Sequence, residues 1–199
     1  LEGVSIWIYA GIVGAATDNI VTSGDVQVDV TDPTIPGGAG VGGNTILNGG
    51  IVVRFEAGHR IDVDTNTVYG CAGDGIRIEG QPGGSLTLSR NIVASCERGI
   101  VWNAPLQPAD IFCNDVWQNV GGDWIGVPGA TVLDGNMSLD PLFCDPAAGN
   151  LMLAADSPCL PGNPGNGNCG QIGALGVGCE GSQVVDGGER ATSGPRIRI

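Results

Sequence analysis

Two stretches of the chain, IDVDTNTVYGCAGDGIRI (residues 61–78) and LTLSRNIVASCERGIVW (residues 86–102), determine how the rest is interpreted. Placed one above the other, they show the same order of features. Each has an alternating apolar run, an asparagine, a second apolar run, a cysteine, and a third apolar run that begins just after a glycine. A unit of this size that recurs in tandem predicts a repeat protein.

The asparagine returns along the chain at intervals of 22–25 residues, at Asn19, Asn44, Asn66, Asn91, Asn114 and Asn136. An apolar series keeps nearly the same period, at Val26, Ile51, Ile76, Ile100 and Trp124. Two series with one period predict stacked coils, each made of three short strands joined by turns. We therefore expect an all-β fold, a right-handed parallel β-helix of about six coils, with neighbouring coils roughly 4.8 Å apart.

The asparagines have a physical reason to recur. A sharp bend between two strands leaves backbone N–H and C=O groups unpaired, and an inward amide side chain can both donate to and accept from them. The same amide can bond to the asparagines of the coils above and below, as in stacked amide ladders. Asparagine also tolerates the left-handed backbone conformation that such bends need. We therefore expect an internal asparagine ladder.

Composition excludes several functions. Glycine supplies 36 of the 199 residues, which favours tight turns over helices because glycine destabilises a helix interior. The net charge of −13 argues against nucleic acid or anionic lipid as a partner, since phosphate binding requires clustered cations. The chain contains no lysine, which rules out Schiff-base chemistry and a lysine-bearing phosphate loop. No apolar run is long enough to span a membrane.

The seven cysteines predict disulfides and an oxidising compartment, and hence a secreted or cell-surface protein. Cys71 and Cys96 share one phase of the repeat and could form either an inter-coil disulfide or a stack of thiols. Their spacing fits no zinc motif, and His59, the single histidine, is expected to be exposed on a turn. Four cysteines fall late in the chain, at Cys144, Cys159, Cys169 and Cys179, where disulfides should pin an irregular segment.

The repeat phase also sorts side chains into inward and outward sets. Arg54 shares an outward phase with Asp29 and Glu79, so it is expected in a surface salt-bridge stack rather than in catalysis. Trp102 is expected to point into the core. Trp117 is expected to point outward, which makes it the aromatic candidate for stacking on a sugar ring.

From Asn136 the sequence changes character, with NMSLDPLF (136–143), SPC (157–159) and IGA (172–174) in succession. Over residues 44–179 this resembles the end of secreted bacterial proteins of the right-handed parallel β-helix, pectate-lyase-like class. The resemblance implies coils over residues 1–136 and a segment over 137–179 that caps the last open coil, followed by a linker-like tail over 180–199. At the other end, residues 3–9 already have a strand pattern, so further coils or end-to-end stacking on a partner are expected there.

Enzymes of that class group carboxylates on the helix face and in some cases bind Ca²⁺, so Ca²⁺ is the one cofactor to consider. Here Asp62 and Asp64 should face the same side about 7 Å apart, with Asp110 further along the stack. That arrangement supports an alternative function as a polysaccharide lyase or glycoside hydrolase. Because no established acid–base motif is present, the favoured function is a non-catalytic extracellular or cell-surface scaffold, adhesive or in contact with polysaccharide or cell-surface glycans.

Overall fold

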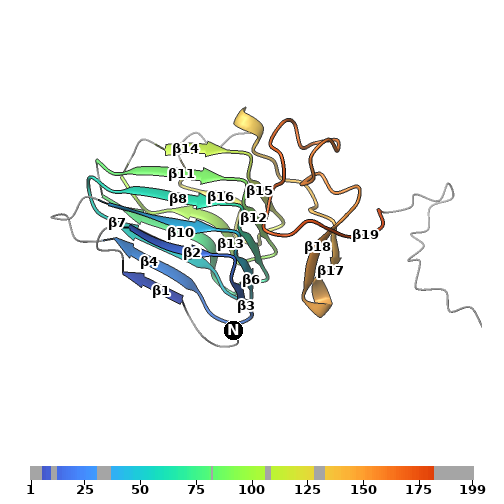
Figure 1. The fold of residues 1–199 in the computed structure, drawn as a ribbon, viewed down its shortest axis with the longest axis horizontal. Coiled ribbons are helices and arrows are strands. Elements are labelled where there is room, and N and C mark those ends of the chain that lie inside the picture. The colour runs from blue at the N-terminus through green and yellow to red at the C-terminus, as the bar shows by residue number, and fades with distance from the viewer. Residues whose placement is uncertain are drawn as a thin grey trace, which may run out of the picture.

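The computed structural model describes residues 6–9, 13–30, 37–81, 83–105, 109–127 and 133–181. They form a parallel β-solenoid of about six turns, in which three sheets surround one core (Figure 1). The predicted all-β solenoid is therefore confirmed. No helix among the described residues has the length and apolar character needed to cross a membrane.

Among the described residues, five coils each contribute one strand to each sheet, and a sixth contributes a strand to the first sheet. All strand pairs within the three sheets are parallel. The first sheet contains β1 (Ile6–Tyr9), β4 (Val26–Val30), β7 (Ile51–Phe55), β10 (Asp74–Gly80), β13 (Arg98–Trp102) and β16 (Trp124–Ile125). The second contains β2 (Val13–Thr17), β5 (Gly38–Gly42), β8 (Arg60–Asp64), β11 (Ser85–Ser89) and β14 (Ala109–Phe112). The third contains β3 (Ile20–Val21), β6 (Thr45–Leu47), β9 (Thr67–Tyr69), β12 (Ile92–Ala94) and β15 (Asp115–Trp117).

The register follows the repeat, so residues of one phase stack directly over one another. Ile51 pairs with Ile76, and Ile76 with Ile100, all three completely buried. Trp102 is also buried in this core, as its phase predicts. Alternation along each strand turns the residues between these rows outward.

The asparagine ladder is present. Asn44 Nδ2 donates to Asn66 Oδ1 at 2.8 Å, and Asn66 Nδ2 donates to Asn91 Oδ1 at 2.9 Å. The same pattern continues at both ends, so that Asn19, Asn114 and Asn136 complete the series. Each amide also bonds backbone groups, as when Asn91 Nδ2 donates to the Val63 and Ser89 carbonyls.

The backbone at these bends differs from expectation in one respect. The left-handed residue is not the asparagine but the one before it. These residues, with φ between 52° and 77°, are Asp18, Gly43, Thr65, Arg90, Cys113 and Gly135. The tolerance of asparagine for this conformation is therefore not what places it in the ladder. The preceding residue makes the bend, and the asparagine amide then bonds the backbone groups that the bend exposes.

The C-terminal segment, defined here as residues 137–181, forms a small mixed sheet from β17 (Phe143–Asp145), β18 (Asn150–Ala154) and β19 (Val177–Cys179). Two short 3₁₀ helices, η1 (Leu133–Gly135) and η2 (Pro146–Ala148), flank β17 in the sequence. The segment lies beside the strands of the third sheet (Figure 1). Leu153 and Ile172 pack with Ile92 and Ala94, and the Ala174 N–H donates to Thr67 Oγ1 at 2.9 Å.

Met137 of the segment pairs with Asp115 of the last coil, and much of the rest of the segment lies along the outer side of the third sheet. The physical reason is that several outward positions of this sheet are apolar, Ile92, Ala94, Tyr69 and Trp117 among them. Removing these side chains from water favours the lateral position by roughly 25 cal/mol per Å² of apolar surface. The expected tail falls largely outside the described residues, which end at residue 181.

Three disulfides join six of the seven cysteines and indicate an oxidising setting. Cys71–Cys96 links neighbouring coils, which decides between the two alternatives for this pair. Cys113–Cys169 ties the C-terminal segment to the solenoid, and Cys144–Cys179 closes a loop within the segment. Cys159 is different, because it is a buried free thiol and pins nothing covalently.

Candidate functional site

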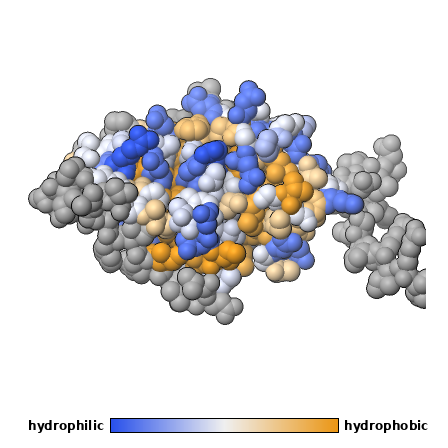
Figure 2. Space-filling view, in the orientation of Figure 1, coloured by the Kyte–Doolittle hydropathy of each residue, from blue (hydrophilic) through white to orange (hydrophobic). Residues whose placement is uncertain are grey.

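The candidate site is the outer surface of the second sheet on β8, β11 and β14, which we call the polar face. Its outward side chains are Arg60, Asp62, Asp64, Ser85, Thr87, Ser89, Asp110 and Phe112. The structure thus brings Asp62, Asp64 and Asp110 onto one face. In the view of Figure 2, hydrophilic side chains project over the solenoid with apolar areas between them.

Asp62 is paired with an arginine of its own strand. Arg60 Nε donates to Asp62 Oδ2 at 3.3 Å, and Arg60 Nη2 donates to Asp62 Oδ1 at 3.2 Å. The hydrogen bond and the charge of Asp62 raise the pKa of the Arg60 guanidinium, and the charge of Asp110 adds to the effect. Asp62 and Asp110 lie on either side of Thr87, so the three form one outward row across neighbouring strands.

Asp64 is held more firmly, by the next coil. Ser89 Oγ donates to Asp64 Oδ1 at 2.7 Å, and Arg90 Nε donates to the same oxygen at 2.9 Å. A second Arg90 nitrogen donates to Asp64 Oδ2. Both oxygens are therefore engaged, which orients the carboxylate and links two coils. Proton transfer to a substrate would first require Asp64 to leave these partners.

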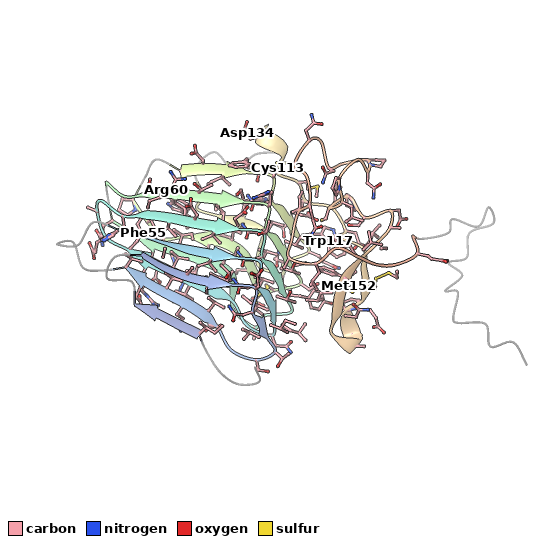
Figure 3. The ribbon with its side chains drawn as sticks, viewed as in Figure 1. Phe55, Arg60, Cys113, Trp117, Asp134 and Met152 are labelled. Atoms are coloured by element: carbon pink, nitrogen blue, oxygen red, sulfur yellow. A yellow bond between two sulfur atoms is a disulfide. The ribbon has the colours of Figure 1, made fainter. Side chains whose placement is uncertain are left out.

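Asp110 lies in a different environment at the edge of the face. It and Phe112 both point outward from β14, and Phe112 is 37% exposed. They line a shallow depression together with Ala109, Ile111 and Asp134. Figure 3 shows Asp134 on the short helix next to β14, with Arg60 further along the same face. The depression therefore combines an exposed aromatic ring with two exposed carboxylates.

Trp117, the predicted aromatic contact, lies elsewhere. It points outward from the third sheet but is half-buried beneath the C-terminal segment, packed against the cluster that contains Met137 and Leu160 (Figure 3). It is therefore separate from the carboxylates of the polar face.

The structure also places the two other residues considered for catalysis. Arg54 pairs with Glu79 at 2.7 Å and with Asp29 at 3.4 Å, which confirms the predicted stack. The expectation of an exposed His59 is wrong, because the ring is buried and its Nδ1 lies 3.1 Å from the Glu56 carbonyl oxygen. Across the described ranges, no three His, Cys, Asp or Glu side chains are grouped to hold a metal ion.

No protein-family model, curated protein or solved structure matches this chain. The chemistry of the polar face is therefore the basis on which a function can be inferred.

Sequence reasoning missed two members of the site. Phe112 could have been found, because it lies two positions after Asp110 and so shares its outward direction. Asp134 carried a comparable signal, because it lies two residues before Asn136, just as Phe112 lies two residues before Asn114. The Cys113 N–H accordingly donates to the Asp134 carbonyl oxygen, which places Asp134 next to β14.

Proposed function

We propose that this protein is a non-catalytic scaffold of the extracellular space or cell surface that binds glycans at the Phe112 depression. The observation that carries the proposal is the exposed Phe112 ring beside Asp110 and Asp134. An aromatic ring offers a flat apolar surface for the C–H face of a sugar. Carboxylate oxygens on either side accept hydrogen bonds from its hydroxyl groups.

The negative charge of the protein indicates which kinds of glycan it can bind. The net charge of −13 repels acidic polysaccharides, and both polar groups of the depression are carboxylates. Neutral or amino-bearing sugars therefore fit better than uronic acids. The three disulfides are consistent with a glycan-rich, oxidising exterior.

The test is binding of neutral and amino-sugar oligosaccharides to the full chain, first on a glycan array and then by calorimetry. Phe112→Ala should weaken binding about tenfold, equivalent to about 1.4 kcal/mol. Val120→Ala is the control, because Val120 is 83% exposed and lies outside the polar face. Unchanged affinity in Phe112→Ala, or no binding to any glycan, would contradict the proposal.

A second candidate is a polysaccharide lyase or glycoside hydrolase. It is favoured by Asp62 and Asp64, which lie two positions apart on one face of β8 with their Cα atoms about 7 Å apart, so that their carboxyl groups could reach the spacing of an inverting pair. Release of reducing ends or unsaturated products should be measured on acidic and neutral polysaccharides, with and without Ca²⁺. Glu97→Gln, a change at an exposed turn, is the control. Cleavage that is lost in Asp64→Ala but retained in Glu97→Gln would favour the enzymatic function over the scaffold function.

The handedness of the coil and the family of the protein are part of the same proposal. We propose a right-handed coil, because parallel strand connections are right-handed in nearly all proteins. Membership of the pectate-lyase-like class rests on the C-terminal motifs alone. In this protein those motifs lie largely in the C-terminal segment, where Ser157 and Ile172 are buried.

A further inference from the structure

Asp115 is a buried carboxyl group at the joint between the solenoid and the C-terminal segment. It begins β15 and points outward, yet its exposed fraction is 0% because the segment covers it. The Leu139 N–H donates to Oδ1 at 3.0 Å, and the Cys159 thiol donates to Oδ2 at 3.2 Å. Both donors belong to the C-terminal segment, so Asp115 is a polar contact by which the solenoid holds it.

Among the described residues, the charged groups that act on Asp115 are carboxylates. The neighbouring strand β12 places Ile92 opposite it in the register. The charged groups whose fields reach it are Asp123 from the following turn and Asp140 from the segment, both carboxylates. Among the ion pairs of the described residues, none joins Asp115 to an arginine.

Asp115 changes its protonation state near neutral pH. Burial raises the pKa of the Asp115 carboxyl to about 7, with smaller contributions from Asp123 and Asp140. Burial, followed by the charge of Asp115, raises the pKa of the Cys159 thiol, so Cys159 stays protonated and remains a donor. Near neutrality Asp115 therefore changes charge while its partners do not.

We propose that Asp115 is a pH-sensitive latch that holds the C-terminal segment on the third sheet more firmly in mild acid than above neutrality. Below neutrality the neutral carboxyl is buried at little cost. Above it, an ionised carboxylate is buried without a cation and repelled by Asp123 and Asp140, so the joint loosens. The Cys113–Cys169 disulfide keeps the segment attached while the latch is open. What the opening uncovers is the side of the third sheet around Ile92 and Trp117.

The sign follows from proton linkage. The pKa of Asp115 is higher in the docked state than in the solvent-exposed state, so docking binds a proton. The stabilisation from protonation is complete below about pH 4 and is lost progressively as the pH rises to about 7. Between pH 5 and pH 8.5 the opening equilibrium should increase roughly a hundredfold.

Hydrogen exchange tests the latch directly. Protection factors of amides in residues 137–179, corrected for the intrinsic effect of pH, should fall about a hundredfold between pH 5 and pH 8.5. Those of β10 should not change in parallel. Asp115→Asn should abolish the pH dependence, whereas Glu97→Gln, which alters one exposed carboxylate, should retain it. Equal protection at both pH values, or an unchanged fall in Asp115→Asn, would overturn the proposal.

A second measurement covers the case in which Asp115→Asn does not fold. The ¹³C signal of the Asp115 carboxyl in the unsubstituted protein should titrate with a midpoint near 7. A midpoint of about 6 or above supports the latch. A midpoint below that excludes it, because the carboxyl would then already be charged throughout the neutral range.

Discussion

The ladder asparagines show how much a single side chain contributes. Asn91 donates to the Val63 and Ser89 carbonyls and to Asn114, and its own carbonyl accepts two hydrogen bonds from Asn66. It is completely buried, so no water can replace these partners. The amide therefore joins two neighbouring coils to the bend on which it lies.

Asn91→Ala should lower the free energy of unfolding by about 3 kcal/mol, because it leaves several buried backbone groups without partners. Urea denaturation measures the effect. Asn103→Ala is the matched control, since Asn103 is exposed and outside the ladder, and it should change stability by less than about 0.5 kcal/mol. Equal losses in the two variants would show that the ladder bonds add nothing.

At the scale of elements, the C-terminal segment depends on a few apolar anchors. Leu153 and Ile172 are completely buried against the third sheet, and the Tyr69 and Phe143 rings meet edge to face with centroids 5.6 Å apart. The other side of β18 faces outward, where Met152 is 37% exposed. One strand thus presents an anchoring side and a solvent side.

Ile172→Ala should destabilise docking by about 2–5 kcal/mol, the usual cost of such a truncation in a packed core. Met152→Ala, also a truncation in the segment, should cost less than about 0.5 kcal/mol. Protease sensitivity and hydrogen exchange of residues 137–179 report the effect. If the two substitutions loosen the segment equally, Ile172 is not an anchor.

At the scale of the whole molecule, charge opposes compactness. The net charge of −13 on 199 residues repels itself, and salt screens this repulsion. Raising NaCl from about 0.01 M to about 0.5 M should therefore raise the melting temperature at pH 8. The increase should be smaller near pH 4, where carboxyl groups are partly protonated. A melting temperature that falls with salt at pH 8 would mean that the surface ion pairs outweigh the repulsion.

The regular part of this fold was predictable because each coil repeats the same physical problem. A fixed period placed Asn66 and Asn91 at bends, Ile76 and Trp102 in the core, and Arg54 between two carboxylates. The irregular part was not predictable, because no period relates the C-terminal segment to the sheet it covers. Asp115 has the phase of an exposed residue, and only docking of the segment buries it.

The same distinction applies to the candidate site. Asp62, Asp64 and Asp110 were found on one face from strand alternation alone. Their partners were not all apparent, since Arg90 follows the end of β11 and turns back to Asp64 of the previous coil. Asp134 has the phase of Phe112 in the next coil, and the Cys113 N–H donates to its carbonyl oxygen.

The direction of the asparagine bonds has a consequence for how such a chain lengthens. Every described rung donates from Nδ2 of one asparagine to Oδ1 of the next along the sequence, from Asn19 to Asn136. Each coil thus offers a donor toward one neighbour and an acceptor toward the other. A tandem duplication of one unit would enter the stack with its bonds already matched. Lengthening of the solenoid by tandem duplication would therefore require no new type of contact between coils. The number of coils can change while the asparagine ladder stays the same.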